Sequence, residues 1–325
     1  MGELDPAIEE LVKQAEELAE AGHTREALEH WRTVIGHITD PDMLCEYGDL
    51  AELLEEWAEA EDAYLSAIRL EPEWAGPYEA LSILYMHRHA AGDLELAEKY
   101  LKMCLELEKS PHAYTLLGVT QERLGNRIKA RESYNEALAI DPDYDEAYYN
   151  LGVTYREENP AKAISLFRKA LELDTKYQAA YRELGWTLKL LKQYDEAEIN
   201  LRKSIELDDK DGWAYIYLGN LHWAKQNLLS AEENFKTAID IWPHSSIPYW
   251  SLAHLYECQE RASEADFFYE KALQIEPDNA TANYRYGVFL KDSGEIERAK
   301  FLLNRAANLN PEDDRAGLLL IELED

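Results

Sequence analysis

The chain is 325 residues long, 46% hydrophobic and 30% charged, and it contains only 15 Gly and 11 Pro, a balance that excludes an intrinsically disordered chain. Its formal charge is −32, from 65 acidic and 33 basic residues. Because such a field repels nucleic-acid phosphates and anionic membrane surfaces, we predict that neither nucleic acid nor a membrane is a partner.

Cysteine usage and the N-terminal sequence favour a cytoplasmic location. Cys45, Cys104 and Cys258 lie far apart and make none of the CxxC or Cys/His spacings of a zinc site, so we expect reduced thiols. The N-terminal stretch MGELDPAIEELV lacks the basic and apolar regions of a signal peptide, and the chain contains no run of about 18 apolar residues.

A period of about 34 residues runs through the chain. We count nine copies, which begin near Ile8, Pro41, Ala75, Pro111, Asp145, Gln178, Gly212, Ser246 and Ala280, the last ending near Asp313. One column holds alanine in every copy: Ala27, Ala60, Ala97, Ala130, Ala163, Ala197, Ala231, Ala265 and Ala299. About twelve residues earlier stands a column of small residues: Ala15, Gly48, Ser82, Gly118, Gly152, Gly185, Gly219, Ala253 and Gly287.

Each copy also combines small and large residues as a pair of packed helices requires. Seven residues after the alanine, a second small column contains Ala67, Cys104, Ala137, Ala170, Ser204, Ala238, Ala272 and Ala306, with Val34 as the exception. Four residues after the alanine, large residues include Trp31, Tyr64, Tyr134, Phe167, Phe235 and Tyr269. Small residues let a neighbouring helix approach closely while large ones fill the remaining space. Proline often closes the copy, as at Pro142 and Pro277, so we predict two antiparallel helices per copy.

In the copy that begins at Asp145, the columns match a known signature. These matching residues are Tyr148, Leu151, Gly152, Tyr155, Ala163, Phe167 and Ala170. Over residues 8–313 the chain resembles the tetratricopeptide repeat family. The resemblance implies an all-α fold, a right-handed superhelical solenoid of antiparallel helix pairs in which the first helix of each pair lines a concave groove. We expect residues 1–325 to form a single solenoid of this kind.

Two copies depart from the common length, and a short segment follows the last copy. The third copy has an insertion around HRHAAG, residues 87–92, and the fifth lacks one residue near Asn159 and Pro160. We expect both changes to lie in turns between helices. Residues 314–325 are predicted to form a capping helix whose Leu and Ile side chains cover the last repeat, which leaves no room for a catalytic domain.

The chain lacks the common motifs of catalytic and cofactor sites. GxxxxGK[ST], HExxH and GxSxG are absent, so we predict no catalytic residue, no cofactor and no metal site, and hence no enzyme. His87 and His89 form an HxH pair, but a metal would need a third ligand such as Asp93, and a solvated loop is the favoured interpretation. The acidic run EWAEAED is interpreted as a solvated helix face and not as a mimic of nucleic acid.

The resemblance places groove-facing side chains at the second, fifth, ninth, twelfth and thirteenth positions of each copy. In copies five to nine, these positions supply the candidate peptide-binding residues Tyr149, Arg156, Arg182, Trp186, Lys189, Trp213, Asn220, Trp223, Trp250, His254, Tyr284 and Lys291. Four of the eight tryptophans fall here, although tyrosines already occupy the aromatic packing columns. Trp, Tyr and Arg dominate binding hot spots. The alternative is that some of these residues, Trp213 above all, pack between neighbouring repeats.

Three of the candidates, Arg156, Arg182 and Lys189, form a basic strip suited to a carboxylate. The alternative is pairing with neighbouring groove acids such as Glu146 or Glu157. Two ligand sets of the family are not matched. Where co-chaperone members carry the first Lys and Asn of their carboxylate clamp, this chain has Tyr149 and Val153, and Asn150 stands alone in the asparagine column of the glycosyltransferase members.

We therefore predict a scaffold or adaptor that binds a peptide or helix of another protein in its groove, without catalysis. The alternative is a neutraliser or carrier of a basic partner protein, because residues 1–110 carry a formal charge of −19 and residues 111–310 only −8. Binding of a basic partner would weaken steeply with salt, whereas aromatic groove binding would not. The oligomeric state, monomer or homodimer, is left open.

Overall fold

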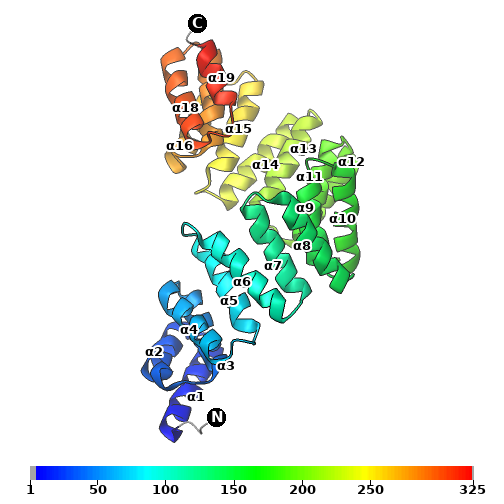
Figure 1. Ribbon diagram of the computed structural model, residues 1–325. Coiled ribbons are helices and arrows are strands. Elements are labelled where there is room, and N and C mark those ends of the chain that lie inside the picture. The colour runs from blue at the N-terminus through cyan, green and yellow to red at the C-terminus, as the bar shows by residue number, and fades with distance from the viewer. Residues whose placement is uncertain (1–4, 324–325) are drawn as a thin grey trace. The chain divides into compact units, whose positions relative to one another are not determined.

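The computed structural model describes residues 5–323, and this part of the chain folds into 19 α-helices and one short 3-10 helix, Ile35–His37, without any strand. The predicted all-α fold is therefore confirmed. The chain divides into two compact units, Met1–Tyr155 and Arg156–Asp325. Successive helices within each unit lie side by side in chain order (Figure 1).

The first unit contains nine α-helices within its described residues. They are α1 (Pro6–Glu20), α2 (Thr24–Val34), α3 (Pro41–Leu53), α4 (Trp57–Leu70), α5 (Gly76–Arg88), α6 (Asp93–Leu107), α7 (Pro111–Arg123), α8 (Arg127–Ile140) and α9 (Asp145–Tyr155). Helices α1 with α2, α3 with α4, α5 with α6 and α7 with α8 pack as pairs, and each pair packs on the next. Residues 89–92 of the predicted insertion form the turn between α5 and α6, whereas His87 and Arg88 belong to the last turn of α5, so the insertion lies in the turn only in part.

The second unit repeats this arrangement. Its helices are α10 (Pro160–Leu173), α11 (Gln178–Leu190), α12 (Tyr194–Leu207), α13 (Gly212–Ala224), α14 (Leu228–Ile241), α15 (Ser246–Cys258), α16 (Ala262–Ile275), α17 (Ala280–Asp292), α18 (Ile296–Leu309) and α19 (Arg315–Glu322). The pairs are α11 with α12, α13 with α14, α15 with α16 and α17 with α18, and the first helices α11, α13, α15 and α17 also contact one another in succession.

Capping residues define where many of these helices begin. The side chains of Asp5, Asp40, Ser110 and Asn159 accept hydrogen bonds from backbone N–H groups of the first turn, and each helix has proline at its start. Proline suits this position because its missing N–H would have no partner there and its φ is already helical.

The small and large columns pack against one another as predicted. All nine alanines of the first column are 0% exposed. A Cβ atom added to Gly48 would lie 2.5 Å from Cε1 of Tyr64, and one added to Gly219 would lie 2.7 Å from Cε1 of Phe235. Glycine therefore stands where the large residue of the second helix meets the backbone of the first, and the ring fills the space that a side chain would have taken.

The turns inside the pairs share one backbone feature, a residue with positive φ. Gly22, Gly125 and Gly294 take this place in three turns, and Glu55 and Lys192, with φ of 62° and 59°, take it in two others. Only glycine adopts this left-handed conformation without a steric penalty.

The predicted capping helix is present as α19. Ala316, Leu319, Leu320 and Leu323 pack with Leu303 and Ala306 of α18. Leu318 and Ile321 are 55% and 61% exposed, so the prediction that the Leu and Ile side chains cover the last repeat is correct for three leucines and wrong for Leu318 and Ile321. Residues 324 and 325 of the predicted cap lie outside the described residues. No helix in the described part of the chain has both the length and the apolar character needed to cross a membrane.

Candidate functional site

The second unit, Arg156–Asp325, holds eleven of the twelve candidate groove residues. Tyr149 lies on α9 in the first unit, and Arg156 precedes α10. The others are on the first helices of successive pairs, α11, α13, α15 and α17. All twelve side chains are half-buried, so each is packed on one side and open to solvent on another.

Aromatic rings connect α11 with α13. Trp186 of α11 stacks on Tyr217 of α13, with ring centroids 4.6 Å apart and an interplanar angle of 23°. Trp213 contacts Tyr217 at 5.8 Å and meets Trp242 edge-on, also at 5.8 Å. Nζ of Lys189 lies 4.4 Å from the centre of the Trp186 ring, a cation–π geometry. The rings therefore hold one another in position while keeping part of their area open.

A second cluster connects α13, α15 and α17. Trp223 meets the ring of His254 edge-on at 4.8 Å. Nη1 of Arg285 lies 3.1 Å from Nδ1 of His254, and its guanidinium lies over the ring of Trp250, 5.0 Å from the centroid. We call the rings of Trp186, Trp213, Tyr217, Trp223, Trp250 and His254 the aromatic surface.

The imidazole of His254 is neutral in this arrangement. Burial, and next the charge of Arg285, lower its pKa to about 4. A neutral ring offers one nitrogen as an acceptor, which suits the guanidinium donor of Arg285. Two donors in this cluster, Trp250 Nε1 and Arg285 Nε, are buried without a hydrogen-bond partner among the described residues.

The two arginines of the predicted basic strip are already neutralised. Nη1 of Arg156 lies 2.6 Å from Oε2 of Glu183, and Nη1 of Arg182 lies 2.6 Å from Oδ2 of Asp211. Glu183 and Asp211 are only 5% and 7% exposed. The pairing alternative thus describes both arginines correctly, although their partners are not the predicted Glu146 and Glu157.

The remaining polar candidates differ in whether their side chains have a charged or hydrogen-bonding partner. Among the described residues, Lys189 has no carboxylate within ion-pair distance, and burial lowers its pKa. Lys291 pairs with Asp292 at 3.2 Å. The side-chain amide of Asn220 makes no hydrogen bond to any described residue and is half-buried on α13 between Trp213 and Trp223 in the sequence.

A cavity of about 260 Å³ opens beside the second cluster. It is lined by His254, Glu257, Tyr269, Tyr284, Arg285, Val288 and Arg315. Arg315 is held by Asp313, with Nη2 2.6 Å from Oδ2, and its guanidinium lies 4.8 Å from the ring centre of Tyr284. Arg285 has no carboxylate within ion-pair distance among the described residues, so it is the cationic group of this cavity that lacks a charged partner.

Sequence reasoning missed one column that contributes to the site. Glu183, Tyr217 and Arg285 all stand at the sixth position of their copies, next to the fifth position that the family resemblance assigns to the groove. All three contact groove candidates. The charged or aromatic residues at the sixth position were the signal in the sequence that could have identified this column.

No three His, Cys, Asp or Glu side chains in the described residues cluster as metal ligands would. Asp93, the possible third ligand beside His87 and His89, is 2% exposed and accepts hydrogen bonds from the Arg88 guanidinium. His87 lies against Glu52 instead. His87 therefore lies in the last turn of α5, and only His89 lies in the turn that follows, where Arg88 and Asp93 form an ion pair.

Comparison with known proteins identifies the repeat. Models of the tetratricopeptide repeat match residues 12–73, 129–158, 155–211 and 258–321. Together these matches cover more than half of the chain, which belongs to the tetratricopeptide repeat family. The repeats make it a protein–protein interaction scaffold. No curated protein sequence matches the chain.

Solved structures with a similar fold are also tetratricopeptide repeat proteins. One from Parabacteroides merdae is 24% identical, with a TM-score of 0.64, and the match covers 76% of this chain and 99% of that one. Yeast Tom70 is 14% identical, with a TM-score of 0.59 over 99% of this chain and 89% of its own. Cut9, in the Cut9–Hcn1 hetero-tetramer of the APC/C, is 16% identical, with a TM-score of 0.61 over 93% and 59%. At these identities the likeness concerns the fold.

Proposed function

We propose that the second unit binds a peptide or helical segment of a partner protein on the aromatic surface, without catalysis. The observation that carries this proposal is the row of half-buried rings on α11, α13 and α15, which are fixed by mutual contacts and keep exposed area. Rings already fixed in place lose little conformational entropy on binding, so more of the contact energy becomes affinity.

Specificity would come from the polar groups among the rings. The free amide of Asn220 suits the backbone of a bound segment, since it offers both a donor and an acceptor. Lys189 and Arg285 suit carboxylates of the ligand, because neither has a carboxylate within ion-pair distance in the part of the chain that the structure describes. Arg156 and Arg182 instead hold the unit together through Glu183 and Asp211.

Two buried donors support a binding role for the second cluster. Trp250 Nε1 and Arg285 Nε have no hydrogen-bond partner among the described residues. Such groups are rare in folded proteins and call for an explanation. A ligand that moves the Arg285 side chain and accepts hydrogen bonds from these two donors would provide the explanation.

A display screen with the full chain tests the proposal. We expect enriched peptides to combine aromatic or aliphatic anchors with an acidic residue. Trp223→Ala and Trp250→Ala should each weaken the binding of these peptides at least tenfold, a loss of about 1.4 kcal/mol or more.

The matched control for this screen is Phe301→Ala, which removes an aromatic ring that is 66% exposed on α18, a second helix. It should leave the affinity unchanged. Enriched peptides that bind both groove variants as tightly as the unmodified chain would overturn the proposal.

A further inference from the structure

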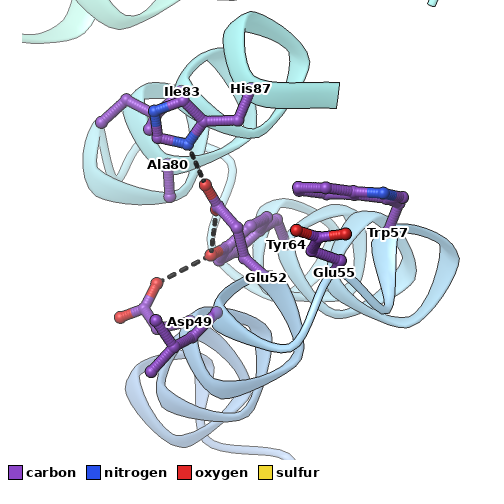
Figure 2. A pocket seen from close by; sticks show the side chains of 9 residues that line it. Asp49, Glu52, Glu55, Trp57, Tyr64, Ala80, Ile83 and His87 are labelled. Carbon is purple, nitrogen blue, oxygen red and sulfur yellow. Dashed lines mark hydrogen bonds and ion pairs between the residues drawn. The ribbon is translucent and has the colours of Figure 1, made fainter. Parts of the chain in front are cut away.

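The first unit contains a separate pocket between α3, α4 and α5, with a volume of about 590 Å³ (Figure 2). It is lined by Asp49, Glu52, Leu53, Glu55, Trp57, Tyr64, Ala80, Ile83 and His87. Acidic and apolar side chains thus face the same space. Several of these residues stand at the groove positions of copies two and three, whereas the predicted groove candidates all lie in copies five to nine.

The carboxylates of this pocket have no cationic partner of the Lys or Arg type within ion-pair distance in the described part of the chain. The Tyr64 hydroxyl lies 2.7 Å from Oδ1 of Asp49 and 3.1 Å from Oε2 of Glu52. Nδ1 of His87 lies 2.8 Å from Oε1 of Glu52, and the His87 side chain is 61% exposed. The side chain of Glu55 makes no hydrogen bond or ion pair with the described residues.

Other carboxylates of the same unit, by contrast, are paired with arginine side chains. Glu59 receives two hydrogen bonds from Arg32, and Glu61 and Asp93 share Arg88. The arginines near the pocket are therefore engaged elsewhere. Between residues 40 and 87 the chain has thirteen Asp and Glu against a single Arg, which leaves a formal charge of −12.

The apolar part of the pocket is also exposed. Leu53 is 70% exposed, and Trp57, Ile83 and Ala80 are half-buried. In Figure 2, Glu55 and Trp57 line the same pocket, and Glu52 lies between His87 and Tyr64. A ligand here would therefore meet an aromatic face and a carboxylate together.

We propose that this pocket takes an arginine or lysine side chain from a basic segment of a partner protein. The aliphatic part of such a side chain matches Leu53, Ile83 and Ala80, and its charged end matches Glu52, Glu55 and the face of Trp57. Charge complementarity identifies the occupant, because a neutral or acidic ligand would leave these carboxylates uncompensated. The acidic residues around the pocket extend well beyond one side chain, which favours a polypeptide over a small cation.

This site is independent of the aromatic surface, since it lies in the other unit and uses other residues. The probe is a fluorescein-labelled nine-residue peptide with three arginines separated by alanine and glycine, titrated with the full chain at about 50 mM salt. We expect saturable binding that Glu52→Gln/Glu55→Gln weakens at least tenfold. Trp57→Leu keeps an apolar contact but loses the aromatic face, and should weaken binding about threefold or more.

The matched control is Glu71→Gln/Glu73→Gln, which removes the same charge from two exposed residues between α4 and α5. It should weaken binding less than threefold. Equal weakening by the two double variants would mean that the peptide is attracted by the overall charge, and it would overturn the proposed binding site. Unchanged binding to Glu52→Gln/Glu55→Gln would overturn it as well.

Two further measurements separate the alternatives. Spermine that displaces the peptide at equal charge concentration would indicate a polyamine site and overturn the protein partner. Trp223→Ala should leave the peptide affinity unchanged, so failure of this pocket and failure of the aromatic surface give different results. Thermal melts of each variant confirm that it remains folded.

Discussion

At the scale of single residues, His254 connects the aromatic surface to pH. The ring contacts Trp223 of α13 and Arg285 of α17, with Glu257 nearby on its own helix, and its pKa is lowered from 6.5 to about 4 by burial and by Arg285. The unfolded chain therefore binds the proton more readily. The stability that this neutral ring contributes is present above pH 6.5 and is lost as the pH falls towards 4.

We predict that His254→Gln removes this acid sensitivity. The unfolding free energy of the unmodified chain minus that of the variant should be larger at pH 7.5 than at pH 5, by about 1 kcal/mol once solvent screening of the half-exposed ring is allowed for. Urea titrations at the two pH values measure this difference. A difference that is the same at both pH values would show that the ring is not held neutral.

The tryptophans should separate into structural and surface residues. Trp31 is 1% exposed in the core of the first unit, so Trp31→Ala should cost about 3–5 kcal/mol. Trp223 and Trp250 are half-buried against the core of the second unit, and Trp186 stacks mainly on Tyr217. We expect Trp186→Ala to keep the most of the melting temperature, then Trp223→Ala and Trp250→Ala, and Trp31→Ala the least. If Trp186→Ala lowered the melting temperature as much as Trp31→Ala, Trp186 would be a core residue and not part of a binding surface.

The sequence predicted which residues would face a groove, which stays a prediction, but not what their side chains would touch. Arg156 and Glu183 are 27 residues apart, and Arg182 and Asp211 are 29 apart. Both pairs join neighbouring repeats, and in each the acidic partner, Glu183 or Asp211, stands outside the family's groove columns. Such contacts depend on how one repeat is stacked on the next, which a pattern within a single repeat does not contain.

At the scale of helices, the alanine column makes a direct prediction. Ala197 is 0% exposed on α12, and a Cβ atom added to Gly185 of α11 would lie 3.0 Å from its carbonyl oxygen. Ala197→Tyr should therefore overpack the α11–α12 contact and cost about 1–3 kcal/mol or more. Ile199→Gln, at a side chain 68% exposed on the same helix, should change stability by less than about 0.5 kcal/mol. Chemical denaturation of both variants would refute the packing scheme if their stabilities were equal.

The turn inside each helix pair offers a substitution that we expect to stabilise the fold. Lys192 is exposed and has a φ of 59°, at the place that Gly22, Gly125 and Gly294 take in other pairs. Lys192→Gly should raise stability by about 0.5–1 kcal/mol, because it removes the penalty of a side chain in the left-handed region. In the reciprocal control, Gly125→Ala should lower stability. If Lys192→Gly were destabilising, the turn would not have this conformation.

Helix positions were predictable from the sequence because one packing rule recurs in every copy. Small residues at Gly48 and Gly219 and large ones at Tyr64 and Phe235 identify the same contact from either side. The acidic pocket of α3, α4 and α5 was not predicted, since its carboxylates resemble those of any solvated helix face until their lack of basic neighbours is seen in three dimensions.

At the scale of the whole molecule, charge separates the two units. Met1–Tyr155 has 34 acidic and 12 basic residues, a formal charge of −22, and Arg156–Asp325 has 31 and 21, a charge of −10. Repulsion between carboxylates affects Glu46, whose pKa is raised first by burial and then by the carboxylates of Glu16 and Asp42. That residues 1–325 form one continuous solenoid stays a prediction.

Self-repulsion of this size predicts that salt stabilises the two units unequally. The Debye length shortens from about 30 Å at 0.01 M salt to about 10 Å at 0.1 M, so added salt screens the carboxylates of α3 and α4 from one another. In a repeat protein each pair is stabilised mainly by its neighbours, so this gain should stay local. Hydrogen exchange of the full chain, followed helix by helix, should slow in α3 and α4 by a larger factor than in α13 and α15 when salt is raised from about 20 to 500 mM. Equal slowing in both units would mean that the negative charge of the first unit does not limit its stability.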